Sequence, residues 1–112
     1  MAALTATTVT TVGGLADIEG AAVAAAGGGD TAPVGPGLFL VLFNGDASPH
    51  TATIATPGTV DGHAVSDATL VVAAGEIGLI PLTNLFRGTN DVAAITYDDV
   101  TSVTVAVLKL GA

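Results

Sequence analysis

The apolar runs after residue 37 are all short, and turn residues bound each of them. The run "LFLVLF" at 38–43 lies between Gly-Pro-Gly and Asn-Gly-Asp, and the Thr-alternating run "TATIAT" at 51–56 ends at Pro57-Gly58. Short runs between such turns are typical of β-strands, because amphipathic helices need longer periodic segments. The continuous apolar character of 38–43 predicts a central strand that is covered on both faces.

Further strand-length segments continue to the end of the chain. The segment 59–65 contains an Asp-Gly turn, and the acidic tetrapeptide "DDVT" separates the last two segments, which we expect to form a hairpin. From Val103 to Val107 apolar residues alternate with small or polar ones, as in a half-buried strand. The other expected strands are 68–74, 76–82, 92–97 and 102–110. This spacing predicts an all-β fold, an antiparallel β-sandwich of jelly-roll-like type over residues 37–112.

Residues 1–36 differ from the rest because they consist mostly of Ala, Thr and Gly. We expect an extended N-terminal arm, with an extended segment at Thr5–Val12 and a weak element near Ile18–Ala26. The alanine run at 21–26 predicts at most one helical turn, since glycines flank it on both sides. Because the arm offers few core-forming side chains, we expect neighbouring subunits to order it.

The strand patterns also predict which side chains form the core of the sandwich. We expect inward-facing positions to alternate along each strand. The predicted core residues are Leu38, Leu40, Leu42, Ile54, Val71, Ile80, Ile95, Val103, Val105 and Val107.

The composition excludes several classes of function. Charged residues make up 11% of the 112 residues, against about 25% in an ordinary soluble domain. The only basic residues are Arg87 and Lys109, and the formal net charge is −8. Binding to nucleic acid needs clustered cations, so we expect no direct nucleic-acid partner. No run approaches the length of a membrane span, and the absence of Cys excludes disulfides and thiolate chemistry.

Two His/Asp pairs are the candidate metal ligands, Asp61 with His63 and Asp46 with His50. A metal site needs three or four converging ligands, and Asp-Gly is a common turn sequence. We therefore expect both histidines on exposed loops, with no metal and no cofactor.

The candidate catalytic groups also lack the sequence motifs of known active sites. The serines Ser48, Ser66 and Ser102 lie in no nucleophile motif, and Gly27–Gly29 lacks the Lys of a phosphate-binding loop. We interpret the glycine run as a flexible joint. Asp98-Asp99 would suit a hard cation or paired-carboxylate chemistry, but an acidic tip is more often a solvated turn. We therefore expect no enzyme activity.

One exposed loop offers a candidate interface residue pair, Phe86 and Arg87. Arginine and aromatic side chains are enriched in protein interfaces. The alternative is a local ion pair between Arg87 and Asp91.

From Pro36 to Leu110, about two thirds of the chain, the sequence resembles the head decoration or cement proteins of tailed bacteriophages and archaeal tailed viruses. The stretches that carry the resemblance are "FLVLFNGDASPHTATIATPGTVDG", "VVAAGEIGLIPL" and "AITYDDVTSVTVAVLKL". The resemblance implies a small β-sandwich on the capsid exterior, bound to the major capsid protein and often assembled as a homotrimer. It implies no catalytic residues, and the Ala/Gly-rich segment at 15–37 departs from the pattern.

The expected function is therefore a structural virion protein that decorates and stabilises the outside of a capsid. The low charge agrees with it, since a surface of Thr, Ala, Gly and Val is usually covered by a partner. Two alternatives stay open: a head–tail connector, tail or fibre component of the virion, and a cell-surface binding module.

Overall fold

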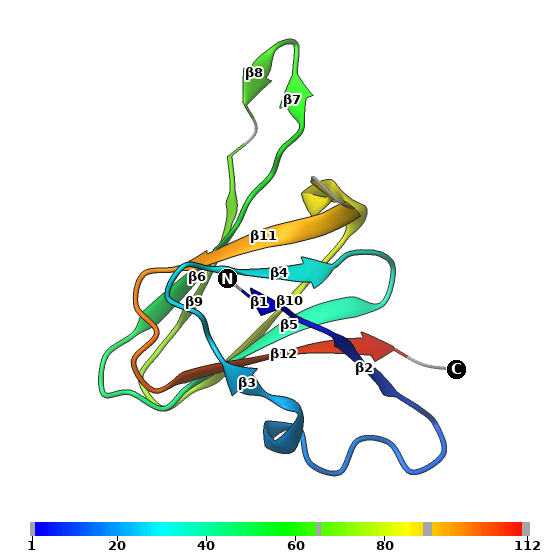
Figure 1. Cartoon of the computed structure of the whole chain (residues 1–112), viewed down its shortest axis with the longest axis vertical. Coiled ribbons are helices and arrows are strands. Elements are labelled where there is room, and N and C mark those ends of the chain that lie inside the picture. The colour runs from blue at the N-terminus through cyan, green and yellow to red at the C-terminus, as the bar shows by residue number, and fades with distance from the viewer. Residues whose placement is uncertain (1, 65, 89–90, 111–112) are drawn as a thin grey trace.

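The computed structural model describes residues 2–64, 66–88 and 91–110, and its strands form two packed five-stranded sheets (Figure 1). In strand order, sheet A contains β1 (Ala2–Ala3), β4 (Asp30–Pro33), β11 (Val92–Tyr97), β6 (His50–Ile54) and β9 (Ala68–Val72). Sheet B contains β10 (Ile77–Pro81), β5 (Leu38–Asn44), β12 (Val103–Leu110) and β2 (Ala6–Val9), with β3 (Val23–Ala24) also paired to β12. The predicted all-β sandwich is confirmed, whereas the jelly-roll topology stays a prediction.

The helical elements whose bounds the structure gives are two short 3₁₀ turns, η1 (Glu19–Ala21) and η2 (Asn84–Phe86). The helical turn expected at 21–26 is therefore replaced by η1 followed by the short strand β3. No helix among the described residues is both long enough and apolar enough to cross a bilayer.

The core lies between the sheets, where side chains alternate inward along each strand. Leu40, Leu42, Ile54 and Val105 are each 0% exposed, and β5 runs between β10 and β12 as the predicted central strand. The other fully buried large side chains include Ile95, Val107 and Leu82.

One of the predicted core positions is wrong. Val71 is 65% exposed, because Val72 occupies the inward position of β9 and alternation turns Val71 outward. Ile80 takes the predicted inward position and packs against the core cluster, and it is partly rather than fully buried because β10 is an edge strand.

Several connections at one end of the sandwich cross from one sheet to the other. Among them are the connections from β5 to β6, from β9 to β10 and from β11 to β12. The hairpin predicted across "DDVT" is therefore wrong, because β11 pairs with β4 and β6 whereas β12 pairs with β5. β11 and β12 instead present their apolar sides to each other across the core.

The N-terminal segment takes part in both sheets. β1 pairs with β4, β2 pairs in parallel with the second half of β12, and β3 pairs with its first half. The expectation that residues 1–36 lack core-forming side chains is wrong, since Leu4, Ala25 and Ala32 belong to the core cluster. Leu4 also donates its N–H to Thr31 O at 2.7 Å.

The glycine run at 27–29 forms a tight turn beside β11. Gly29 has φ +96°, and a Cβ atom there would lie 2.7 Å from the backbone oxygen of Ile95. The flexible joint expected from the sequence is therefore a packed turn at Gly29, where only glycine avoids a collision.

A small hairpin projects from the sandwich between β6 and β9 (Figure 1). Its strands are β7 (Thr59–Val60) and β8 (His63–Ala64), joined by the predicted Asp-Gly turn. Asp61 and Gly62 have φ values of 52° and 79°, as a tight two-residue hairpin turn requires.

Candidate interaction surface and loop cluster

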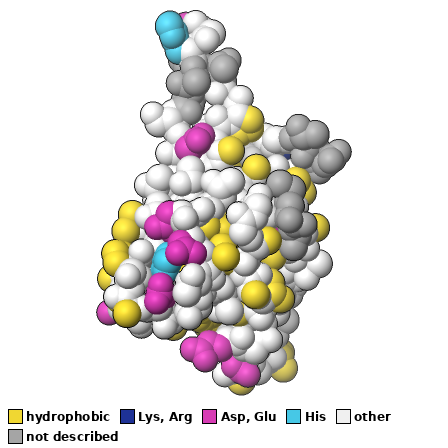
Figure 2. Space-filling view, turned by 60° about the vertical axis from the view of Figure 1, so that its left-hand side comes forward, with side chains coloured by type: hydrophobic (Ala, Val, Ile, Leu, Met, Phe, Trp, Pro, Cys, Tyr) yellow, Lys and Arg dark blue, Asp and Glu magenta, His cyan; other side chains and the backbone are white. Residues whose placement is uncertain are grey.

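The charged residues of the protein lie almost entirely outside the strands. Asp30 is the one acid on a described strand, and it is buried with 0% exposure. Lys109 is near the end of β12, in register with the inward-facing Leu38. The other acids lie in loops and turns: Asp17, Glu19, Asp46, Asp61, Asp67, Glu76, Asp91, Asp98 and Asp99. Figure 2 shows the acidic side chains in separate groups with uncharged surface between them.

The outer face of sheet B is apolar. Strand register places three rows of outward side chains side by side on β10, β5 and β12. Ile77 and Leu79 on β10 are 58% and 59% exposed, and Leu110 at the end of β12 is 68% exposed. Part of this face is covered, because Ala22 packs on Val41, Phe43 and Ala106.

The outer face of sheet A is neutral but more polar. Thr69, Thr53 and Thr96 lie in one row across β9, β6 and β11, and Val71 lies beside Thr51. Threonine carries a small side chain that loses little rotamer entropy at an interface. Both outer faces therefore offer surfaces without charge for contact with a partner.

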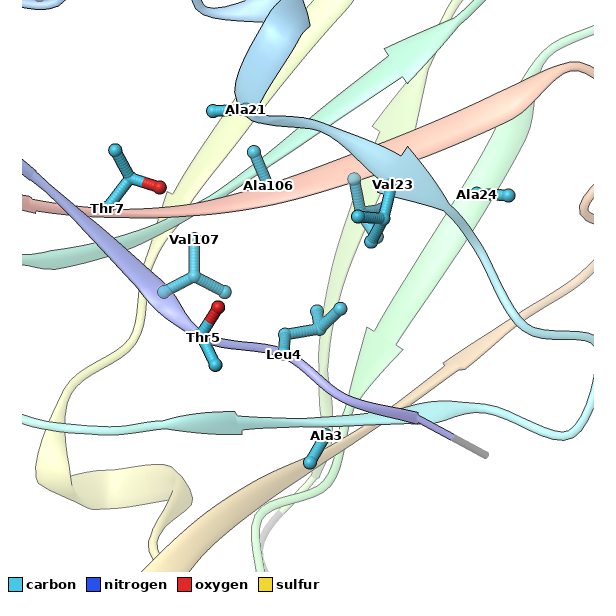
Figure 3. Close-up of a pocket in the computed structure, with 10 residues that line it drawn as sticks. Ala3, Leu4, Thr5, Thr7, Ala21, Val23, Ala24, Ala106 and Val107 are labelled. Carbon is cyan, nitrogen blue, oxygen red and sulfur yellow. The ribbon is translucent and has the colours of Figure 1, made fainter.

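A pocket of about 280 Å³ lies where β2 and β3 meet the same edge of β12 (Figure 3). Its lining consists of small or apolar side chains and two threonines: Ala3, Leu4, Thr5, Thr7, Ala21, Val23, Ala24, Val105, Ala106 and Val107. None of these side chains titrates in the physiological range or binds a metal well. The pocket can accept an apolar group but offers no acid, base or nucleophile.

At one end of the sandwich, Asn44 joins two of the crossing loops. Its Nδ2 donates to Ser48 O at 2.9 Å and to Val72 O at 3.0 Å, and its Oδ1 accepts from Asp46 N. The side chain is 3% exposed, so these bonds replace bonds to water.

Replacing Asn44 with Ala is expected to cost about 1–3 kcal/mol of unfolding free energy, because several partners lose their bonds inside the protein. Urea unfolding followed by circular dichroism measures this cost. Ser48→Ala is the control, since the asparagine contacts the Ser48 backbone and the Ser48 side chain is exposed. Equal stability of the Asn44 variant and the wild type would show that the bonds contribute nothing.

His50 links two other segments of the same loop cluster. Its Nε2 lies 2.8 Å from Asp46 Oδ2, and its Nδ1 lies 3.3 Å from Asp98 Oδ1. The residue is 3% exposed, so the expectation of an exposed loop histidine is wrong for His50, whereas His63 is exposed. A neutral imidazole has one N–H, so only the doubly protonated form donates to both carboxylates.

The charge states of this cluster follow from its contacts. The hydrogen bond from His50 to Asp46 raises the pKa of His50, with further support from Asp98. The same bond lowers the pKa of Asp46, and the N–H of Thr51 is the main cause that lowers the pKa of Asp98. Asp98 thus binds a backbone N–H as well as the imidazole.

We expect these contacts to stabilise the fold most between about pH 4 and pH 6.5. These limits are the pKa values of Asp and His side chains in an unfolded chain. Because the pKa of His50 is raised in the folded state, its contribution to stability is complete below about pH 6.5. This contribution is lost as pH rises through the folded-state pKa. The lowered pKa values of Asp46 and Asp98 mean that their contribution is lost as pH falls below about 4.

The measurement is the difference in unfolding free energy between wild type and His50→Gln across this pH range. The difference should be largest at mildly acidic pH and should shrink above neutrality. His63→Gln is the matched control, because His63 lies exposed in the projecting hairpin. A difference that grows with increasing pH would contradict the assignment.

A second polar contact lies inside the sandwich, between Asp30 and Tyr97. The Tyr97 hydroxyl donates to Asp30 Oδ2 at 2.7 Å, and Ala26 N donates to the same oxygen at 3.3 Å. Burial and the neighbouring carboxylate raise the pKa of Tyr97, which keeps its proton available for this bond. The contact ties the start of β4 to the end of β11.

Of the two predicted interface residues, one is buried and the other is exposed. Phe86 is 5% exposed and belongs to the core, so only Arg87 of the pair lies at the surface. Arg87 Nη2 donates to Asn84 Oδ1 at 2.9 Å. The alternative ion pair with Asp91 does not form among the described residues, where the only ion pairs involve His50. Leu85, 58% exposed, is the apolar side chain that this turn presents.

The other candidate groups do not assemble into a site. Ser48, Ser66 and Ser102 are exposed, and none of their hydroxyls bonds to a histidine in the described ranges. Asp98 and Asp99 form the expected exposed turn, in which Asp99 accepts from the N–H groups of Val100 and Thr101. The described residues contain no cluster of three ligands suited to a metal ion.

Comparison of the chain with known proteins identifies no relative: no family model, no curated protein and no solved structure matches it. Its function must therefore be inferred from its own surfaces. Among the described residues these are two uncharged sheet faces, an apolar pocket, and acids that lie in the loops apart from the buried Asp30.

Proposed function

We propose that the protein is a structural virion subunit that coats the outside of a tailed-virus capsid by binding the lattice of the major capsid protein. The observation that carries the proposal is the absence of charged side chains from the outer faces of both described sheets, in a chain of net charge −8. Both faces thus suit contact with protein, while the acids in the loops give long-range repulsion that favours solubility.

The apolar face of sheet B is the favoured contact surface. Ile77, Leu79 and Leu110 are each more than half exposed, and burying each of them against a partner contributes about 1 kcal/mol. One subunit would bind weakly through such a face, but copies that also contact one another bind with higher avidity. Because few ion pairs can form, we expect the attachment to depend only weakly on salt.

The test is the rupture temperature of purified particles with and without this protein. Particles that lack it should rupture at a lower temperature but still package their genome. Adding back Leu110→Asp protein should restore less of the stability than wild type does. Ser66→Asp adds the same charge in an exposed loop and is the control. Equal rupture temperatures with and without the protein would refute the proposal.

A second candidate role is a connector, tail or fibre component, and the projecting β7–β8 hairpin favours it. A two-stranded hairpin is marginally stable alone, so such an element gains from contact with a neighbouring subunit. Deleting residues 59–64 should then abolish incorporation into particles, whereas a coat protein bound through sheet B should still attach.

A further inference from the structure

One side of the sandwich consists of two open sheet edges. β10 ends the strand order of sheet B, and β9 ends that of sheet A. The two strands lie close together, since a Cβ atom at Gly78 would be 2.8 Å from Val72 Cγ2 and 3.3 Å from Leu70 Cδ1. The sheets are therefore packed tightly on this side, and both edges face outward.

The backbone of β10 presents free hydrogen-bonding groups at this edge. Glu76 O accepts from Asn44 N at 3.1 Å, and Leu82 N donates to Leu38 O at 2.8 Å, so the even-numbered residues bond to β5. Strand alternation then directs the backbone groups of Ile77, Leu79 and Pro81 away from β5. Pro81 has no N–H to offer, which leaves the N–H groups of Ile77 and Leu79 as the outward donors.

The side chains along this edge do not protect it. Natural edge strands usually carry Lys, another charge or a bulge that blocks further pairing. The segment 77–82 contains no charged residue, and Pro81 at its end is the one feature that limits pairing. Ile77 and Leu79 are both more than half exposed. An edge of this kind is normally covered in the functional assembly.

We propose that β10 pairs edge to edge with β10 of a second copy, antiparallel about a twofold axis, so that two copies of sheet B become one continuous sheet. In this register Leu79 lies opposite the second copy's Leu79, and Ile77 lies opposite the second copy's Pro81. The two Leu79 residues then exchange a pair of N–H to C=O bonds at the centre.

Two copies can meet at this edge without bringing their acidic side chains together. Each copy has a net charge of −8, so contacts between loop regions bring acids together. The proposed register places Glu76 opposite Leu82 of the second copy, and the two Glu76 residues are then about 20 Å apart along the strands. This separation exceeds the screening length of about 8 Å at physiological salt.

The test is the mass of the protein in solution, measured by sedimentation and light scattering over a range of concentrations. The wild type should form a dimer as concentration rises. Hydrogen exchange should then slow at the amides of Ile77 and Leu79, because the second copy caps them. This result does not depend on a virion role, which the rupture temperature tests separately.

Two variants locate the contact. Leu79→Pro removes an N–H that faces away from β5, and Leu79→Lys places two like charges opposite each other. Each should weaken the dimer by about tenfold or more. Val71→Lys is the matched control, because Val71 is 65% exposed on β9 and adds the same charge, and it should leave the dimer unchanged.

Several results would overturn the proposal. They are a wild type that stays monomeric at every concentration, a trimer without a twofold contact, a dimer that survives both Leu79 variants, and a dimer that only Val71→Lys disrupts. Because Leu79→Lys leaves the strand backbone unaltered, it tests the contact even if Leu79→Pro fails to fold.

Discussion

Deletion of residues 2–9 is expected to remove most of the stability of the sandwich. The deletion takes away β1 and β2, exposes one edge of β12 and empties the core position of Leu4, which is 8% exposed. Loss of a buried leucine alone costs about 2–5 kcal/mol, and small domains have a total stability of only about 5–15 kcal/mol. Unfolding in urea, followed by circular dichroism, measures the effect.

Two point variants separate the loss of core packing from the loss of chain. Leu4→Ala should reproduce a large part of the destabilisation. Val12→Ala, at a side chain that is 90% exposed, should change the stability by less than about 0.5 kcal/mol. A truncated protein with wild-type stability would show that this segment is a detachable arm, as the sequence alone suggested.

The second large effect is expected at the centre of the core. Leu40 is 0% exposed on the middle strand of sheet B, so Leu40→Ala should cost about 2–5 kcal/mol. Val71→Ala is the matched control on an outward position, where the cost should stay below about 0.5 kcal/mol.

The same unfolding experiment measures both variants. If they are equally destabilising, the inward and outward positions have been assigned incorrectly. If Leu40→Ala has no measurable effect, β5 is not the central strand of a packed core.

The strands were predictable where the sequence pattern is strong. The apolar run at 38–43 and the alternation from Val103 to Val107 correspond to β5 and β12, and 92–97 corresponds to β11 without a shift. In contrast, the sequence could not predict which side chains of β9 face the core. Val71 and Val72 are the same residue type, and either one can face inward. Leu4 was missed because a single leucine in a Thr-rich segment has no pattern around it.

The connection of the strands depends on tertiary packing. The turn residues at 98–101 suit a hairpin within one sheet as well as a crossing between two sheets. The structure has the crossing, because β11 and β12 both carry buried side chains that pack across the core. Local turn chemistry does not distinguish these cases.

The polar contacts could not have been paired from the sequence. His50 and Asp98 are 48 residues apart, and Asp30 and Tyr97 are 67 apart. Only the fold brings them together. One signal was present: Asp30 opens an otherwise uncharged strand, and a carboxylate in that position is either exposed or paired. The uncharged outer faces, in contrast, follow directly from the scarcity of charge in the strand segments.

The number of copies per particle tests the proposed coat function most directly. Quantitative mass spectrometry of purified virus particles gives the ratio of this protein to the major capsid protein. A subunit that covers the shell should be present in hundreds of copies, at a fixed ratio set by the symmetry of the lattice. Absence of the protein from the particle, or a number no larger than a single ring at one vertex, would contradict the proposal.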